Sequence, residues 1–358
     1  MFKRLFLAGC LVLPLASAAK ADTIDTRAVV QGAIEHFVRP GYQRFHQAAG
    51  GLNEATESLC KTPSAEHLAS ARQAFSETVD AWSRVEILRL GPVMDDHRLE
   101  RILFWPDRKS IGLRQVQAVL AEKDESASTV ERIAEKSVAA QGLGALEFVL
   151  FGTGAETLEG TAEPFRCTYG LAITGNLNAM AGELQAAWDD PQGFAAIWAN
   201  PGPDNRLYRN DKEALGELVD VMVQGLEFVR DVRLKAFLRD TAEQDKPRLA
   251  AFRRSEKTLD SLRENMDAMR SLFEESGFAA ALPAEGRETA KSILFEFSNA
   301  ARALDLPKQP LEELLKDRAA RDKLTYFRIV TSSLTKLIGT DLSGALGLSA
   351  GFSSLDGD

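Results

Sequence analysis

Apolar residues recur at three- and four-residue steps along most of this 358-residue chain, and this spacing constrains the fold more than any other feature. Such spacing places the apolar side chains on one face of an α-helix. In the segment 64–90 the stripe comprises Leu68, Ala71, Phe75, Val79, Trp82 and Val85. The same pattern predicts helices over 213–238, 257–274, 285–304, 310–319 and 321–338. Because no alternating apolar runs flank an Asn-Gly or Asp-Gly turn, the sequence favours an all-α fold of helical bundles.

The least regular internal stretch of the chain is 189–211, near the middle of the sequence. Its turn-forming residues include Pro191, Gly193, Pro201, Gly202 and Pro203. Clusters of this kind separate regular segments. We therefore predict two helical-bundle halves, an N-terminal one over 22–210 and a C-terminal one over 211–358.

The first 21 residues have the features of a signal peptide. Lys3 and Arg4 form a positive start, residues 5–15 are apolar, and a small-x-small pattern ending at Ala21 marks a cleavage site. A lipoprotein-type box ending at Cys10 is the alternative, with a lipid anchor on that cysteine, although the apolar stretch before it is short. We expect an exported protein of the periplasm or cell envelope. No later segment is apolar for long enough to span a bilayer, so we expect no transmembrane helix.

The net charge of the chain narrows the range of partners. Without the signal peptide, 40 basic residues face 52 acidic ones, which changes the formal net charge from −9 to −12. This balance argues against nucleic acid as a partner, because phosphate binding needs a basic face, and it leaves room for cations.

Two cysteines remain after the signal peptide, Cys60 and Cys167. In an oxidising envelope they are a candidate disulfide, and two separate buried thiols are the alternative.

The segment 137–152 contains a single carboxylate, Glu147, in an otherwise apolar run. Apolar neighbours surround it on a helix, so we expect Glu147 to face protein rather than bulk water. A buried carboxylate must be paired, hydrogen-bonded or protonated. Gly142 and Gly144 weaken a helix, which indicates that a backbone or a ligand comes close. Glu147 is therefore either a site carboxylate, such as a metal ligand, or a structural acid bonded to an arginine or a helix end.

Two further groups extend a possible metal site. Glu86 is a second acid on a mostly apolar helix and is placed to meet Glu147 or an arginine. His97 and Glu100 have a spacing that puts both on one helix face and suits a metal, although their charged surroundings also fit a solvated helix start. The candidate ligands are Glu147, Glu86 and His97, for iron or another divalent metal. No His-Glu-x-x-His motif, phosphate loop or Gly-x-Ser-x-Gly elbow occurs.

Four segments in this order resemble the imelysin family: the Arg89–Pro92 turn, residues 104–107, the run 141–151 and the ending 351–358. The resemblance covers nearly all of the chain after residue 21. It implies two four-helix-bundle-like halves with the site near their junction, a bacterial periplasmic or outer-membrane-facing location, and a link to iron uptake. Relatives in the family include an alginate-binding protein and a secreted protease, from which the peptidase label comes.

The signature of the imelysin family is Gly-x-His-x-x-Glu. On this chain it falls on residues 142–147, where Gly142 and Glu147 are present and Gly144 stands in place of the His. Imidazole is a strong transition-metal ligand, and a catalytic zinc needs about three protein ligands. The departure therefore counts against peptidase activity, and less strongly against iron binding.

These observations lead to one functional expectation and two alternatives. We expect a non-enzymatic envelope protein associated with iron acquisition, which binds a metal ion, a metal complex or an envelope partner protein. A metallopeptidase of the imelysin type is one alternative. A polysaccharide-binding or purely structural helical module is the other, and aromatic side chains lining a groove would favour it.

Overall fold

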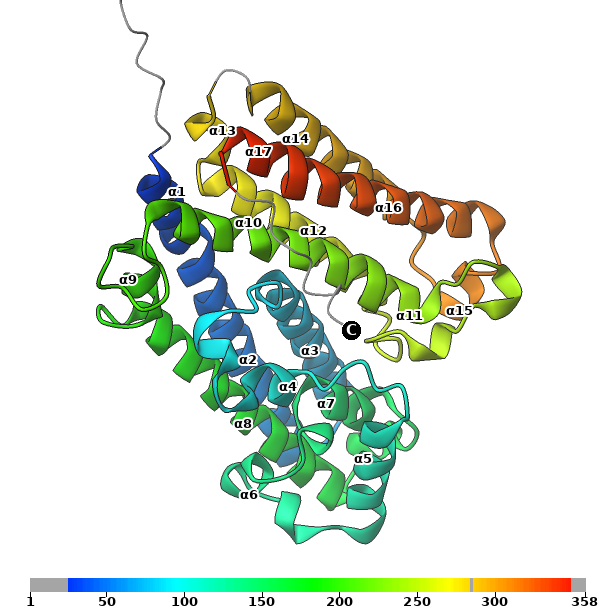
Figure 1. The fold of residues 1–358 in the computed structure, drawn as a ribbon. Helices are drawn as coiled ribbons and strands as arrows, with labels where there is room; N and C mark the ends of the chain where they lie inside the picture. Colours follow the sequence, from blue (N-terminus) through cyan, green and yellow to red (C-terminus); the bar gives the residue numbers. More distant parts are fainter. Residues whose placement is uncertain (1–24, 284–285, 349–358) are drawn as a thin grey trace, which may run out of the picture.

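The structure, a computed structural model, describes residues 25–283 and 286–348. All regular elements in these ranges are helices, so the all-α prediction is confirmed (Figure 1). The proposed signal peptide 1–21 with Cys10, and the ending 351–358, lie outside the described residues. Within the described ranges, no helix has the length and apolar character needed to cross a membrane.

Four helices of the first half pack side by side (Figure 1). They are α2 (Arg39–Lys61), α3 (Ala65–Val85), α7 (Gly142–Phe151) and α8 (Pro164–Asp189). The side chain of Ser64 begins α3 by accepting a hydrogen bond from the backbone N–H of His67 at 3.1 Å. The apolar stripe expected on this helix is buried. The helix ends at Val85, five residues earlier than predicted, and turns carry the chain to Gly91.

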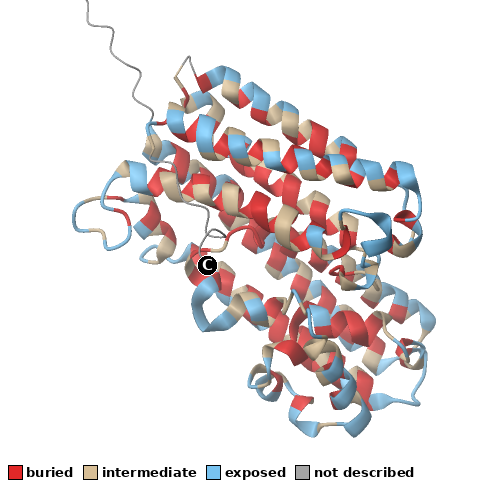
Figure 2. Cartoon of the chain, turned by 45° about the vertical axis from the view of Figure 1, so that its right-hand side comes forward, coloured by how far each residue is buried: buried red, intermediate tan, exposed pale blue. Residues whose placement is uncertain are grey.

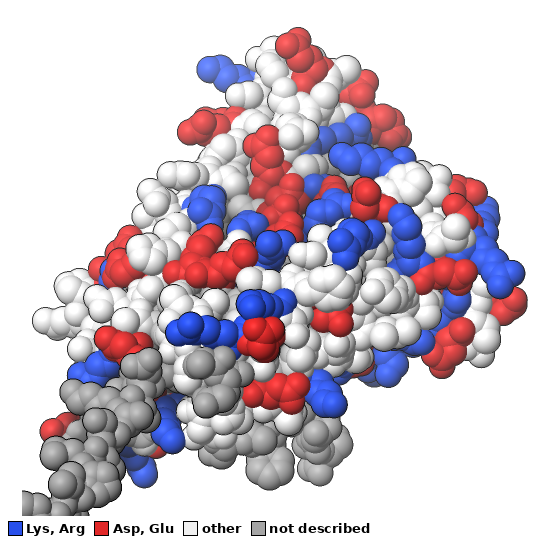
Figure 3. Space-filling view, turned by 90° about the horizontal axis from the view of Figure 1, so that it is seen from above, with Lys and Arg blue, Asp and Glu red and all other residues white. Residues whose placement is uncertain are grey.

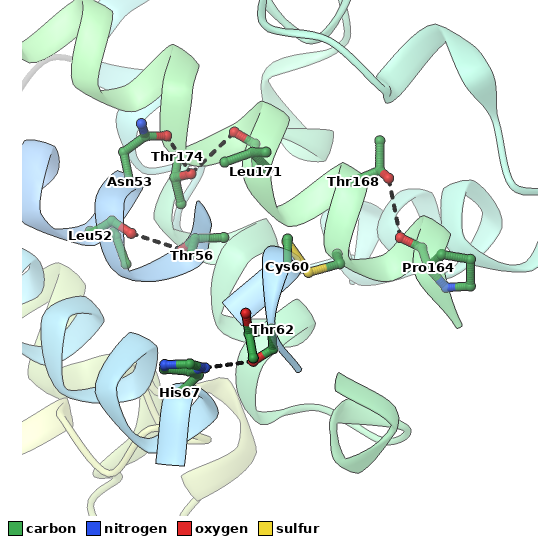
Figure 4. Close-up of a disulfide and its surroundings, with 11 residues drawn as sticks. Leu52, Asn53, Thr56, Cys60, Thr62, His67, Pro164, Thr168, Leu171 and Thr174 are labelled. Atoms are coloured by element: carbon green, nitrogen blue, oxygen red, sulfur yellow. Dashed lines mark hydrogen bonds between the residues drawn. A yellow bond between two sulfur atoms is a disulfide. The ribbon is translucent and has the colours of Figure 1, made fainter. Parts of the chain in front are cut away.

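A disulfide joins α2 to α8 in the first half (Figure 4). It links Cys60 to Cys167, as expected from the sequence, and closes a separation of 107 residues. Close to the disulfide, the buried hydroxyl of Thr56 donates a hydrogen bond to the carbonyl of Leu52, one turn earlier in α2, at 2.8 Å (Figure 4). The covalent link therefore fixes the end of α2 against the start of α8.

A second group of four helices forms the other half (Figure 1). They are α10 (Asp211–Glu227), α12 (Thr258–Glu275), α14 (Gly286–Ala303) and α16 (Arg318–Lys336). The Asn210 side chain begins α10 by accepting from the N–H groups of Lys212 at 3.0 Å and Glu213 at 3.1 Å. The division of the chain at residue 210 stays a prediction.

Shorter helices connect the long ones. The α-helices are α1 (Thr26–Gly32), α4 (Arg98–Ile102), α5 (Ile111–Glu122), α6 (Val130–Ala134), α9 (Phe194–Ala199), α11 (Lys235–Phe237), α13 (Phe278–Ala281), α15 (Leu311–Leu314) and α17 (Ser343–Ala345). The 3₁₀-helices are η2 (Gly91–His97), η3 (Glu125–Ala127), η4 (Val138–Ala140), η5 (Ala155–Glu159), η7 (Ala242–Gln244) and η8 (Pro247–Leu249). The π-helices are η1 (Ala33–Val38), η6 (Phe228–Leu234) and η9 (Leu337–Leu342).

One predicted helix differs in extent. The segment 310–319 is not one helix: α15 ends at Leu314, and α16 begins at Arg318, where the Asp317 side chain accepts from the N–H of Ala319 at 2.9 Å. The helix predicted over 213–238 corresponds to α10, η6 and α11 in succession. Its apolar spacing continues through the π-helical turn of η6, which inserts without ending the helix.

The two halves are in close contact. Helix α3 packs on α12, and α1 packs on α10. Buried residues run continuously through both halves (Figure 2). At this seam Glu86 lies 3.5 Å from the Nη2 of Arg233, and Asn265 donates to Glu86 at 3.0 Å and to the carbonyl of Ser83 at 2.6 Å. The seam therefore contains buried polar groups as well as apolar packing.

Candidate functional site

A cavity of about 840 Å³ lies between the two halves. On one side it is lined by the segment 103–116 and by one face of α7. On the other side it is lined by residues of 231–239 and 246–254. We call this cavity the seam cleft. Its volume is within the range of small-molecule sites, which are usually about 300–1,000 Å³.

The two glycines at the start of α7 have different surroundings. Gly142 has a φ of +72°, and an added Cβ would lie 2.3 Å from the carbonyl oxygen of Arg101 and 2.4 Å from that of Ile102. Its conformation and its close backbone neighbour both require glycine. Gly144 is exposed to the seam cleft, and no atom lies within 4 Å of an added Cβ. Close approach therefore explains Gly142, whereas Gly144 faces open space.

Glu147 lies one helical turn after Gly144 and is 4% exposed, which confirms the expected burial. One carboxylate oxygen accepts hydrogen bonds from the backbone N–H groups of Arg254 and Ser255, both at 3.0 Å, and from the Ser255 Oγ at 2.9 Å. The other oxygen lies 3.9 Å from the Nη1 of Arg254. Burial raises the pKa of Glu147, while the hydrogen bonds from Ser255 and the charge of Arg254 oppose that rise. Glu147 thus ties α7 of the first half to a loop of the second.

The loop held by Glu147 has an unusual backbone. Phe252 has a φ of +57° and Glu256 a φ of +58°, in the left-handed region that disfavours bulky side chains. Residues held in this region cost on the order of 1–2 kcal/mol each and occur where the surroundings impose them. The Phe252 ring is buried under the Arg233 guanidinium, whose carbon lies 5.3 Å from the ring centroid. Packing and the three bonds to Glu147 therefore hold the loop in place.

The structure does not bring the three expected metal ligands together. Glu86 is paired with Arg233 and Asn265 at the seam, and it does not line the cleft. His97 is exposed, with a φ of +54°, on the turn before α4. Across 25–283 and 286–348, no group of three or more His, Cys, Asp and Glu is placed to hold a metal ion. Of the three expected ligands, only Glu147 lines the cleft.

A model of the imelysin family matches residues 38–337 of the chain. This chain belongs to the imelysin family. Iron-regulated protein A of Synechococcus elongatus is 24% identical over 315 residues, which cover 85% of this chain and 83% of that protein. A solved imelysin-like protein from Psychrobacter arcticum superposes with a TM-score of 0.77 at 16% identity, covering 92% of this chain and 99% of that one. At that identity the likeness concerns the fold.

The imelysin signature can now be placed on the structure. Its segment, residues 142–147, forms the first two turns of α7 at the edge of the seam cleft. The position of the family's His, Gly144, is directed at the cleft, and the family's Glu is directed at the loop 252–256. In this chain the signature therefore supplies one hydrogen-bonded carboxylate and an open position.

Sequence reasoning missed the residues that give the cleft its charge. Lys246, Arg248, Arg253 and Arg254 all line it and occur within nine positions of an acidic chain. The sequence signal for a basic cleft was this local basic run, which a net charge taken over the whole acidic chain does not reveal. Trp105, whose peptide bond to Pro106 is cis, also lines the cleft.

Proposed function

We propose that this member of the imelysin family is a non-enzymatic protein of the bacterial cell envelope that takes part in iron acquisition by binding an iron complex in the seam cleft. The observation that supports this proposal most strongly is the coincidence of the family signature with a cavity of about 840 Å³. Similarity to an iron-regulated protein supports the iron context. The signal-peptide features of residues 1–21 support export.

The surroundings of Glu147 favour a metal complex over a bare ion. One of its oxygens already accepts three hydrogen bonds, and the guanidinium of Arg254 lies beside the other. A bare iron ion would need several ligands from the protein, and the position that would hold the family's His is Gly144. A complex brings its own ligands, so the protein has only to recognise its outer surface.

The same shortage of ligands argues against a metallopeptidase. A catalytic zinc needs about three protein ligands and an open position for water. Glu147 is one carboxylate already engaged by the loop 252–256. Chelator-sensitive cleavage of a test protein, lost in Glu147→Ala, would contradict the proposal and support the peptidase alternative.

A polysaccharide is a second candidate ligand, and two aromatic side chains favour it. Phe104 and Trp105 line the cleft and are half-buried, so each leaves part of a ring accessible. Sugar rings stack on such surfaces in the manner of other apolar faces. Saturable binding of an oligosaccharide, without any binding of iron complexes, would show that the cleft binds a polysaccharide instead of an iron complex.

The proposal is tested by blocking the cleft. Gly144→Phe places a ring in the open space, whereas Gly51→Phe introduces the same ring at an exposed helical glycine of α2 that also has no atom within 4 Å of an added Cβ. We expect purified mature protein and Gly51→Phe to retain a ferric chelate in equilibrium dialysis with metal analysis. Binding by Gly144→Phe should fall by about tenfold or more, equivalent to about 1.4 kcal/mol. Equal retention by all three proteins, or none by any, would refute the proposal.

Export has its own test. The mass of the protein purified from the periplasmic fraction should correspond to a start near Asp22. A lipid-modified start at Cys10 would replace the soluble form by an anchored one. Recovery of the uncleaved chain from the cytoplasm would remove the envelope location.

A further inference from the structure

The side chains around the seam cleft carry an excess of positive charge. Seven Lys and Arg residues line it, against three Asp and Glu: Arg108, Lys235, Arg239, Lys246, Arg248, Arg253 and Arg254 face Asp107, Glu147 and Asp231. The chain as a whole has the opposite balance, with 43 basic and 52 acidic residues. On another face of the molecule both signs are interspersed (Figure 3). The basic excess of the cleft is therefore a local feature.

The three acids of the cleft are already engaged by the protein. Asp107 accepts from the first two N–H groups of α5, those of Ile111 at 2.6 Å and Gly112 at 3.0 Å. Asp231 pairs with Arg230, and Glu147 holds the loop 252–256. Acids that accept hydrogen bonds from the protein have less capacity left for a cation. These acids are therefore less available to a ligand than the basic side chains opposite.

Most of the basic side chains have no such partner. Arg108, Lys235, Lys246, Arg248 and Arg253 make no side-chain hydrogen bond or ion pair with the residues that the structure describes. An anion that enters this cleft therefore gains ion pairs without breaking existing ones. Like charges in a concave surface reinforce one another's potential, which favours a ligand of opposite sign.

Two further arginines that line the cleft, Arg239 and Arg254, are half-buried. The Nε of Arg239 is buried without a hydrogen-bond partner in the described part of the chain. The Arg254 guanidinium lies over the Phe148 ring, 5.3 Å from its centroid. Burial and then the neighbouring charge of Arg253 lower the pKa of Arg254, while the carboxylate of Glu147 raises it. A planar guanidinium donates two parallel hydrogen bonds to a carboxylate, so this environment suits carboxylate groups.

We propose that the seam cleft recognises its ligand as an anion and binds a small polycarboxylate, either free or as an iron chelate. The inference rests on the proposed function for the location of the ligand and adds its chemical class. Several carboxylates are needed because the unpartnered cations are distributed over both walls, on Arg108 of the first half and on Lys235, Lys246 and Arg248 of the second. A ligand with several carboxylates can pair with cations of both walls at once. Ferric chelates of hydroxycarboxylic acids keep a net negative charge and an outer surface of carboxylate oxygens.

The test uses charge reversal on the rim of the cleft. Lys246→Glu with Arg248→Glu changes two exposed cations of the cleft, and Arg206→Glu with Arg287→Glu makes the same change in net charge at exposed residues that do not line it. Citrate, ferric citrate and inorganic phosphate are titrated into each protein by calorimetry, at low and at high salt. We expect citrate and ferric citrate to bind the unmodified protein. The rim variant should bind them about tenfold or more weakly, and the control variant within about twofold.

The outcomes separate this inference from the proposed function. Charge-dependent binding of citrate alone supports the inference even if ferric citrate fails, in which case the iron function is wrong. Binding of ferric citrate that is equal in both variants and insensitive to salt supports the iron function and overturns the inference. Binding of phosphate without citrate overturns the polycarboxylate, and so does the absence of binding by either citrate form.

Discussion

The two glycines of the imelysin signature should respond in opposite ways to the same substitution. At Gly142 an alanine Cβ would overlap two carbonyl oxygens at 2.3 and 2.4 Å, on a backbone with a φ of +72°. The left-handed conformation costs an alanine about 1–2 kcal/mol, and relief of the overlap adds about 1–3 kcal/mol. We therefore expect Gly142→Ala to lower the free energy of unfolding by about 2–5 kcal/mol. Gly144→Ala meets no atom within 4 Å and should raise it by up to about 1 kcal/mol, because alanine is the better helix former.

The assay is urea denaturation followed by circular dichroism, with linear extrapolation to water. Each variant is compared with the unmodified protein at one pH, and equal slopes against urea show that the same transition is measured. The reasoning would be refuted if the two variants shifted stability in the same direction by similar amounts. A loss of more than about 1 kcal/mol in Gly144→Ala would show that the position is packed against protein.

Three other perturbations have defined outcomes. Burial raises the pKa of Glu147 above its ordinary value of 4.5, so the folded protein binds the carboxyl proton more tightly than the unfolded chain does. The contribution of Glu147 to the free energy of unfolding should therefore fall as pH rises above about 4.5. In urea denaturation at a series of pH values, Glu147→Gln should lack this pH dependence. Replacing Cys60 and Cys167 by alanine, which opens a separation of 107 residues, should lower the unfolding free energy by about 4–5 kcal/mol, and an unchanged urea midpoint would contradict this. Arg233→Met leaves the buried Glu86 without its cation and should cost about 3–5 kcal/mol; a variant as stable as the parent would show that the pair is unimportant.

The sequence predicted the helices because their signal is local. The stripe on α3 and the apolar run of α7 depend only on spacing within one segment, and both correspond to buried helix faces in the structure. The burial of Glu147 followed from the same local argument. The disulfide needed only a compartment and an even pair of cysteines.

The site could not be predicted to the same depth because it depends on residues far apart in the chain. Glu147 is bonded to Ser255, 108 positions later, and Glu86 lies against Arg233. No periodicity connects such pairs, so the acids were grouped with His97 into a metal site that the fold does not assemble. The basic run 246–254 was visible, but its charge was averaged over an acidic chain.

The bonds of Glu147 also limit how the molecule can move. A hinge motion that parts the two bundles would have to break three hydrogen bonds to one buried oxygen, or drag the loop 252–256 along with α7. Long side chains such as those of Lys246 and Arg248 can swing without disturbing any of these bonds. We therefore expect a ligand to enter and leave the seam cleft as the side chains of Lys246 and Arg248 move, while Glu147 and the loop 252–256 stay in place. The rates of binding and release would then depend on side-chain motion rather than on separation of the two bundles.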